Sequence, residues 1–280
     1  MDTLQQYRHD DLTFDIDDSG GDGDLVVLLH GFPETKASWR RATPAPVDAG
    51  YRVVAPDQRG YSPGARPPRR RDYALPKLVA DIIALVDEVG AERFHVVGHD
   101  WGGAVAWSLA EHHADRVVSV TSLATPHPMA MVRSFVSSTQ LLQSYYMFLF
   151  QLPGLPERAM QSRITGRRFR EALVSSGLPA EDADLNMAML RAGGARGALH
   201  WYRALPFGAG SPPGRVRVPT LYVYGTEDMA LSRKAADLTG RYVDAPYRYE
   251  VLEGASHWLP EAESDTVARL VLEHLKAHPI

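Results

Sequence analysis

Short apolar runs rich in β-branched residues alternate with helical patterns along most of this chain. Such runs suit strands that are buried on both faces of a mostly parallel sheet, with right-handed helical crossovers between them. The pattern predicts strands at residues 25–30, 51–55, 94–98, 117–123, 220–224 and 249–252, and helices at residues 75–89, 101–113, 233–240 and 262–278. We therefore expect an α/β fold, and 280 residues suffice for one such domain with an insert.

The alternation is interrupted between residues 129 and 213, where only helical patterns occur. Pro128 at the start and Ser211-Pro-Pro-Gly at the end are typical of element boundaries. Ligands of open α/β sheets bind beyond the carboxyl ends of the strands, so a helical insert here would cover that crevice. We predict a sheet domain of residues 1–128 and 214–280 and an all-helical cap of residues 129–213. The apolar cap residues expected to be mainly core packing are Val136, Leu141, Leu142, Met147, Phe148 and Leu149.

Composition narrows the functional classes. The net charge of −4 gives no electrostatic reason to expect a nucleic-acid partner. The absence of cysteine excludes disulfides and thiolate metal sites, and no metal-ligand spacing such as HExxH occurs, so we expect neither metal nor cofactor. The most apolar stretch, near residues 145–152, is shorter than the roughly 20 residues that span a bilayer. With no basic segment followed by an apolar run at the start, we expect a cytoplasmic protein. Its expected oligomeric state is a monomer or a homodimer.

The strongest chemical motif is Gly98-His99-Asp100-Trp101-Gly102-Gly103, directly between a predicted strand and a predicted helix. It has the nucleophile-elbow pattern, with Asp where esterases place Ser. The turn lifts residue 100 out of the sheet at a helix N-terminus, where backbone N–H groups and the helix dipole favour an ionised carboxylate. Taken alone, the hexapeptide is also compatible with a tight turn in which Asp100 caps the helix.

Three further motifs support the elbow. His30-Gly31-Phe32-Pro33 follows the first strand, where this fold supplies an oxyanion-hole N–H, and we expect the N–H groups of Phe32 and Trp101 to form that hole. Asp228 follows the strand at 220–224, and His257 follows the run at 249–252. The order nucleophile, acid, histidine is that of the α/β-hydrolase fold.

The chain resembles the soluble epoxide hydrolases of the α/β-hydrolase superfamily over nearly its whole length. The resemblance rests on HGFPETKASW from residue 30, APDQRGYSPG from residue 55, GHDWGG from residue 98, and the cap segments SYYMFLFQLPG and LHWYRA. It implies Asp100 as nucleophile, with Tyr146 and Tyr202 holding the epoxide oxygen. One departure is His200, where the family often carries Asn. The residues expected to support the pocket are His30, Gly31, Pro33, Trp39, His99 and Trp258.

Carboxylate chemistry agrees with this resemblance. A serine that attacks a saturated carbon would leave an ether, whereas a carboxylate leaves an ester that an activated water can hydrolyse. Asp has a pKa of about 3.9 and needs no base, so His257 and Asp228 are free to activate the water. A departing epoxide oxygen needs a proton, which a tyrosine with a pKa of about 10 can supply. We expect a small apolar epoxide and water as the substrates.

Two alternatives remain open from the sequence. A haloalkane or haloacid dehalogenase would use the same Asp-His-Asp triad, but dehalogenases that resemble this fold have Asn where Phe32 stands. Fluoroacetate-type dehalogenases typically have Arg where Trp101 stands, whereas Trp101 fits both epoxide hydrolases and haloalkane dehalogenases. A non-catalytic ligand-binding protein of this fold would most readily have lost one of Asp100, Asp228 and His257. Whether His99 tunes the nucleophile or only packs is left undecided by the sequence, and aromatic cap residues are often ordinary core.

Overall fold

The sheet is the centre of the molecule in the computed structural model, which describes residues 3–135, 145–208 and 214–280, without the side chains of Tyr145 and Tyr146. Eight strands in these residues follow the order β1-β2-β4-β3-β5-β6-β7-β8, with β2 antiparallel to β1 and β4 and all other pairs parallel. The strands are β1 Gln6–His9, β2 Leu12–Asp18, β3 Leu25–Leu29, β4 Arg52–Pro56, β5 Phe94–His99, β6 Val117–Leu123, β7 Thr220–Gly225 and β8 Tyr247–Leu252. The predicted mostly parallel sheet is confirmed.

All six predicted strands are present, and the antiparallel pair β1 and β2 is additional. In β2, Phe14 and Ile16 are buried while their neighbours Asp15 and Asp17 are not, so this strand is apolar on one face only. Strand β1 carries one buried side chain, that of Tyr7. A strand with one apolar and one polar face gives a weaker sequence signal than the continuous apolar runs of the inner strands.

The predicted helices are also present, and three of the four have bounds that differ from the prediction. Helix α2 (Leu75–Val89) has the predicted bounds, because Pro76 suits its first turn and Gly90, at φ 80°, ends it. The segment predicted as 233–240 divides into α11 (Arg233–Leu238) and η6 (Thr239–Tyr242). The segment predicted as 262–278 is α13 (Ser264–Ala277), and the short helix α12 (Leu259–Ala262) precedes it. The remaining helices are η1 Lys36–Trp39, α1 Pro44–Asp48, η2 Pro63–Ala65, η3 Arg70–Tyr73, α3 Trp101–His112, α4 Pro128–Phe135, α6 Tyr145–Phe150, α7 Leu155–Gln161, α8 Arg163–Ser175, α9 Ala180–Met189, η4 Leu190–Gly194, α10 Ala195–Arg203 and η5 Leu205–Phe207.

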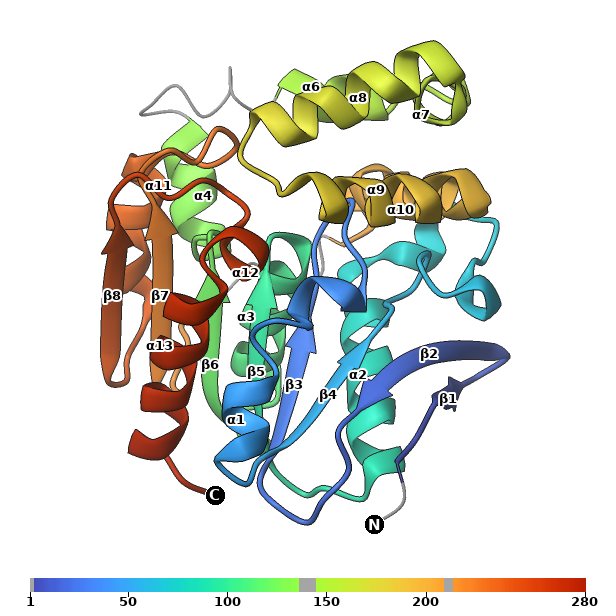
Figure 1. Ribbon diagram of the computed structural model, residues 1–280. Coiled ribbons are helices and arrows are strands. Elements are labelled where there is room, and N and C mark those ends of the chain that lie inside the picture. The colour runs from blue at the N-terminus through green and yellow to red at the C-terminus, as the bar shows by residue number, and fades with distance from the viewer. Residues whose placement is uncertain (1–2, 136–144, 209–213) are drawn as a thin grey trace.

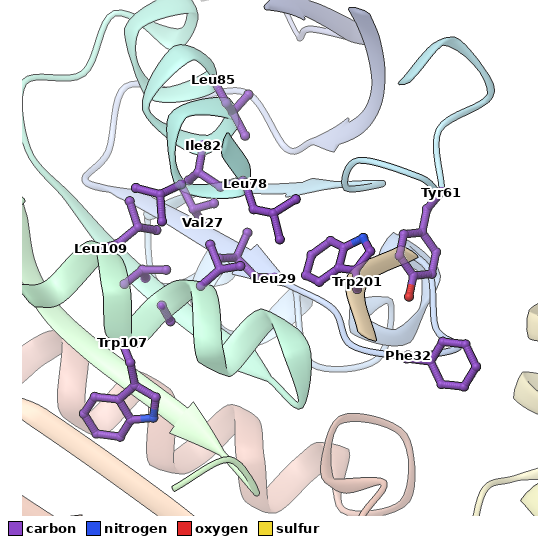
Figure 2. Packing of buried hydrophobic residues seen from close by; sticks show 14 of the residues in the cluster. Val27, Leu29, Phe32, Tyr61, Leu78, Ile82, Leu85, Trp107, Leu109 and Trp201 are labelled. Atoms are coloured by element: carbon purple, nitrogen blue, oxygen red, sulfur yellow. The ribbon is translucent and has the colours of Figure 1, made fainter. Parts of the chain in front are cut away.

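Helices cover both faces of the sheet: α2 and α3 lie on one face, and α1 and α13 lie on the other (Figure 1). Figure 2 shows Leu78 and Ile82 of α2 packed over Val27 and Leu29 of β3. Toward the carboxyl end of β3 the packing becomes aromatic, with Trp201 among the labelled side chains. At the carboxyl end of β3, the hydrophobic core therefore continues into the aromatic residues that surround the predicted site.

The helices between β6 and β7 cover the carboxyl ends of the strands, with α6 to α10 at the opposite end of the molecule from both termini (Figure 1). Helix α10 sits directly on the loop after β4, where the Trp201 Nε1 donates to the Arg59 carbonyl at 2.7 Å. A Cβ on Gly197 would lie 2.5 Å from the Gly60 backbone, so the backbone of α10 and that of the loop after β4 are in direct contact. Helix α4 instead packs against α11 beside the sheet.

The expectation that the apolar cap residues are mainly core is wrong for two of them. Phe148 and Leu149 on α6 are 66% and 52% exposed, because this six-residue helix packs on α10 with one side only. Met147 is partly buried against the main core, as expected. Val136, Leu141 and Leu142 lie outside the described residues. No helix in the described ranges is long and apolar enough to cross a membrane.

Candidate active site

Asp100 occupies a strained turn between β5, which ends at His99, and α3, which begins at Trp101. Its φ of 49° and ψ of −119° lie in a region that non-glycine residues rarely adopt, as the nucleophile elbow requires. A Cβ on Gly102 would lie 2.1 Å from the Leu29 carbonyl oxygen, so only glycine lets the helix start this close to β3. The turn presents the Asp100 side chain above the carboxyl edge of the sheet.

The two carboxylate oxygens of Asp100 have different surroundings. Oδ1 accepts the backbone N–H of Phe32 at 2.8 Å, and Oδ2 lies 3.6 Å from Nε2 of His257. A Cβ on Gly31 would lie 2.4 Å from the Asp100 Cβ, so glycine is required beside the carboxylate. The Asp100 side chain is 18% exposed, whereas that of Asp228 is fully buried. Of these two carboxylates, therefore, only Asp100 can meet a ligand.

His257 is oriented by Asp228. Its Nδ1 donates to Oδ2 of Asp228 at 2.8 Å, and Oδ1 of Asp228 accepts the backbone N–H groups of Ala230 and Leu231 at 2.8 and 2.9 Å. Because an ionised carboxylate can only accept, the proton of this contact sits on Nδ1. Nε2 then faces Asp100 and is the atom available for proton transfer.

Electrostatics favour a charged pair in the resting site. Burial alone would raise the pKa of Asp100, but the hydrogen bond and charge of His257, with His99 and the Phe32 N–H, lower it below its ordinary value. Burial alone would lower the pKa of His257, but Asp228 and Asp100 together raise it well above its ordinary value. The free site thus holds Asp100 as a carboxylate and His257 as an imidazolium.

A second acid–histidine pair, which the sequence analysis missed, lies behind this triad. The two Oε atoms of Glu34 lie 2.8 and 3.0 Å from Nδ1 of His99, whose Nε2 lies 2.8 Å from the main-chain carbonyl of His257. Glu34 also accepts the N–H of Gly31 at 2.7 Å. Both nitrogens of the buried His99 ring therefore face hydrogen-bond acceptors. The one available signal was that Glu34 directly follows His30-Gly-Phe-Pro.

His30 supports the same loop from the other side. Its Nδ1 contacts the Gly31 carbonyl at 2.9 Å, and its Nε2 accepts the backbone N–H of Gln58 at 3.1 Å. The Gln58 side chain donates to the His30 carbonyl at 2.6 Å. Pro33 follows Phe32 through a cis peptide bond. The loop that carries the Phe32 N–H is therefore fixed by hydrogen bonds at His30, Gly31 and Phe32.

The cap brings one of the two predicted tyrosines to this site. Tyr202 is buried, and its ring centroid lies 5.3 Å from that of Phe32 and 5.1 Å from that of Trp101. Tyr202 thus stacks edge-on against both residues predicted to form the oxyanion hole. Tyr146 belongs to α6, but its side chain lies outside the described part of the structure. His200 is buried on the far side of α10, against the ring of Tyr73.

The two tryptophans expected to support the pocket, Trp39 and Trp258, lie in different parts of the structure. Trp258 packs edge-on against His257 at 5.3 Å, and its Nε1 donates to the Ser176 hydroxyl at the end of α8. Trp39 is buried in the core cluster on the face of the sheet that α13 covers. No cluster of three or more His, Cys, Asp or Glu side chains with metal-binding geometry occurs in the ranges that the structure describes.

Comparison with known proteins agrees with this geometry. Residues 24–263 match the family model for the alpha/beta hydrolase fold. Epoxide hydrolase A of Mycobacterium tuberculosis is 36% identical over 90% of both chains, and an AB hydrolase superfamily protein of Bacillus subtilis is 38% identical over 91% of both. The crystal structure of epoxide hydrolase A from Mycobacterium thermoresistibile superposes with a TM-score of 0.84, at 27% identity and 98% coverage of both chains. This chain belongs to the α/β-hydrolase superfamily and, within it, to the epoxide hydrolase family.

Proposed function

We propose that this enzyme opens epoxides with water to vicinal diols through a covalent ester on Asp100. The observation that carries the proposal is the carboxylate itself, which has one oxygen on the Phe32 N–H and the other facing Nε2 of His257. The names of the relatives support epoxide as the substrate class. A carboxylate nucleophile supports an ester intermediate, because attack at saturated carbon by Asp gives a bond that water can later cleave.

In the first step, Oδ2 of Asp100 attacks one ring carbon, and the bond from that carbon to the ring oxygen breaks. The ring oxygen takes a proton from a tyrosine, for which we propose Tyr202 together with Tyr146. The burial of Tyr202 against Phe32 and Trp101 supports this role, because an epoxide seated on Asp100 would meet the same two residues. The products of this step are a hydroxyalkyl ester and a tyrosinate.

In the second step, the imidazolium of His257 first gives its Nε2 proton to the tyrosinate. The neutral Nε2 then takes a proton from water, and the hydroxide attacks Cγ of Asp100. Charge develops on Oδ1, where the N–H of Phe32 and, by our proposal, that of Trp101 stabilise it. The ester bond to the alkyl oxygen breaks, and the diol leaves with a proton from His257. The carboxylate of Asp100 is restored, and the remaining proton of the water goes to Nε2 of His257, which restores the imidazolium of the resting site.

We further propose that residues 1–128 and 214–280 form the catalytic domain and that residues 129–213 form its cap. The position of α6 to α10 over the carboxyl ends of the strands supports this division (Figure 1). It gives the two domains separate chemical tasks, since the sheet carries the triad and the cap carries the tyrosines. The cytoplasmic location, the monomeric or homodimeric state and the absence of metal and cofactor stay predictions.

A substrate panel tests the proposed activity. Purified protein is incubated with aliphatic and aromatic epoxides and with chloro- and bromoalkanes of matched size, and both diol and halide are measured. We expect diol from the epoxides and no halide, with Asp100→Asn as the inactive control. Halide release at a rate equal to or above diol formation would instead assign dehalogenation to this site.

A further inference from the structure

The outermost layer of the cap exposes large apolar side chains. Helices α6, α7 and α8 lie farthest from the sheet, with α9 and α10 beneath them (Figure 1). Of the eleven large hydrophobic side chains that are exposed among the described residues, five lie between residues 148 and 164, each 45–66% exposed: Phe148, Leu149, Leu152, Leu155 and Ile164. A concentration of exposed apolar residues marks a surface that meets a partner or a membrane.

Arginines are interleaved with these apolar residues. Between residues 148 and 170 the chain has five arginines and one acid, Glu157, although the net charge of the whole chain is −4. Glu157 is engaged by the buried Arg203 at 2.5 Å. Four of the five arginines are fully exposed, namely Arg158, Arg163, Arg167 and Arg168. The outer layer of the cap is therefore both apolar and cationic.

Helix α8 shows how this layer is held. Ile164, Arg167 and Arg168 are exposed and follow one another at the spacing of a single helix face. Gly166 is buried, and a Cβ on it would lie 2.4 Å from the carbonyl oxygen of Met160 on α7. The helix is thus packed closely on α7 by one side and presents its apolar and cationic side outward.

A depression in the same surface is lined by four arginines. Its lining residues are Gln161, Arg163, Arg167, Arg170 and Arg191, and in the part of the chain that the structure describes no acid is among them. Asp184 pairs with Arg170 at 2.5 Å and Glu171 with Arg167 at 3.6 Å, but both pairs reach solvent and so contribute little. Guanidinium groups bind phosphate in a bidentate way, so the lining fits a phosphate group.

We propose that the cap docks through this outer layer on an anionic lipid bilayer. The apolar side chains would enter the boundary between headgroups and acyl chains, and the arginines would bind headgroup phosphates. A second copy of the chain fits less well, because it would place these arginines against one another. An acidic protein would pair with the arginines and leave the interleaved apolar residues without a partner.

Vesicle sedimentation tests the lipid and its charge. Protein is mixed with vesicles of phosphatidylcholine, or of phosphatidylcholine with phosphatidylglycerol, at about 0.05 M and about 0.5 M NaCl. We expect binding to the anionic vesicles at low salt. Binding should be at least about 10-fold weaker without phosphatidylglycerol or at high salt, because the attraction needs a negative surface and is screened by ions. Protein that ignores anionic vesicles, or binds both kinds equally, would overturn the proposal.

A charge-matched pair of variants tests the arginines. Arg167→Gln/Arg168→Gln should weaken binding to the anionic vesicles about 10- to 30-fold, since each basic residue at such a surface adds to the affinity. Arg93→Gln/Arg269→Gln removes the same charge from exposed positions of the sheet domain and should bind within about twofold of wild type. Equal losses in the two variants would mean that net charge alone governs binding, and the cap would not be the docking surface.

A second matched pair tests the apolar contacts. Ile164→Ser should weaken binding about 5- to 10-fold, because an apolar side chain no longer leaves water. Ile280→Ser makes the same change at the exposed end of the chain and should leave binding unchanged. The urea midpoint of each variant checks that it is folded. Wild-type binding by Ile164→Ser would contradict insertion of this layer.

A fluorescent label shows which face meets the lipid. The chain has no cysteine, so Leu149→Cys and Ile280→Cys can each carry one polarity-sensitive fluorophore. With anionic vesicles the emission at 149 should shift to the blue, and that at 280 should not change. A shift at 149 that needs only more protein would assign a second copy to this surface, and one that needs poly-glutamate would assign an acidic protein. Either result would overturn the lipid proposal.

These measurements use no epoxide. A protein that converts no epoxide would refute the proposed function, and the vesicle and label results would still decide whether the cap docks on lipid.

Discussion

At the scale of single residues, the pKa of His257 changes between the two steps of the reaction. His257 faces two carboxylates, and both raise its pKa. An imidazolium suits the first step, because its charge keeps Asp100 ionised. Once Oδ2 carries an alkyl group, Asp100 is neutral and only Asp228 still supports the imidazolium. The pKa of His257 must then fall, which turns it into the base that the second step requires.

The tyrosines give the residue-scale prediction. If Tyr146 and Tyr202 both donate to the ring oxygen, either Tyr→Phe change should slow ester formation and leave ester hydrolysis largely intact. A positioned acid contributes about 10² to 10⁴-fold, and a single change should fall at or below the low end because its partner remains. The double variant should lose far more than either single variant, since the two groups act on one atom.

Pre-steady-state measurement of ester formation checks this prediction, with Tyr145→Phe as the control. Tyr145 is the sequence neighbour of Tyr146 on α6, and its loss should change nothing. A double variant that forms the ester at the wild-type rate would mean that the tyrosines are ordinary packing residues, and epoxide would lose its main mechanistic support over halide.

At the scale of elements, the cap is attached to the sheet domain by groups that lie close to the triad. Arg40 and Arg41, directly after η1, bind Glu181 and Asp182 in the first turn of α9. Nearby, Ser176 at the end of α8 accepts the Nε1 proton of Trp258. Cap position and triad geometry are thus connected through residues next to His257.

The Asp182→Asn variant tests how strongly these ion pairs attach the cap to the sheet domain. The Asp182 side chain is 3% exposed and meets two guanidinium groups, so Asp182→Asn should lower the free energy of unfolding by about 1–3 kcal/mol. Asp184→Asn is the matched control on the same helix, because its pair with Arg170 is exposed and should leave the urea midpoint unchanged. Equal urea midpoints for the two variants would show that the buried pair adds nothing to cap attachment.

At the scale of the whole molecule, buried neutral histidines make stability depend on pH. Burial lowers the pKa of His95, His127 and His274 to about 4, against about 6.5 in an unfolded chain. Between these values the unfolded chain binds more protons than the folded one, so the free energy of unfolding falls as the pH falls. Each of the three should account for a loss of about 2 kcal/mol between pH 7 and pH 5.

Urea unfolding of His127→Gln at pH 7 and pH 5 checks this sign. Because one titrating group is removed, the variant should lose about 2 kcal/mol less than wild type over that interval. His112→Gln is the control for the loss of any histidine, since the His112 side chain is 49% exposed whereas His127 is buried. A His127→Gln protein with the wild-type pH dependence would mean that His127 is protonated in the folded state.

The features predictable from sequence are those that depend on local patterns. Helix α2 could be placed from its proline and glycine ends, and the inner strands from their apolar runs. The order of Asp100, Asp228 and His257 predicted which side chains meet. Glu34 could not be found in this way, because its partner His99 lies 65 residues along the chain and only folding brings the two together. The exposure of Phe148 was also beyond local patterns, since it depends on which side of α6 meets α10.

The central claim is that Asp100, and not water, attacks the epoxide. A single turnover with excess enzyme in ¹⁸O-water, followed by mass spectrometry of the peptide that contains Asp100 and of the diol, tests it most directly. We predict that the label enters the Asp100 carboxylate, since water attacks Cγ, while the first diol carries mostly unlabelled oxygen. Label in the diol with none in the Asp100 peptide would show that water opens the ring directly, and the two-step account would be wrong.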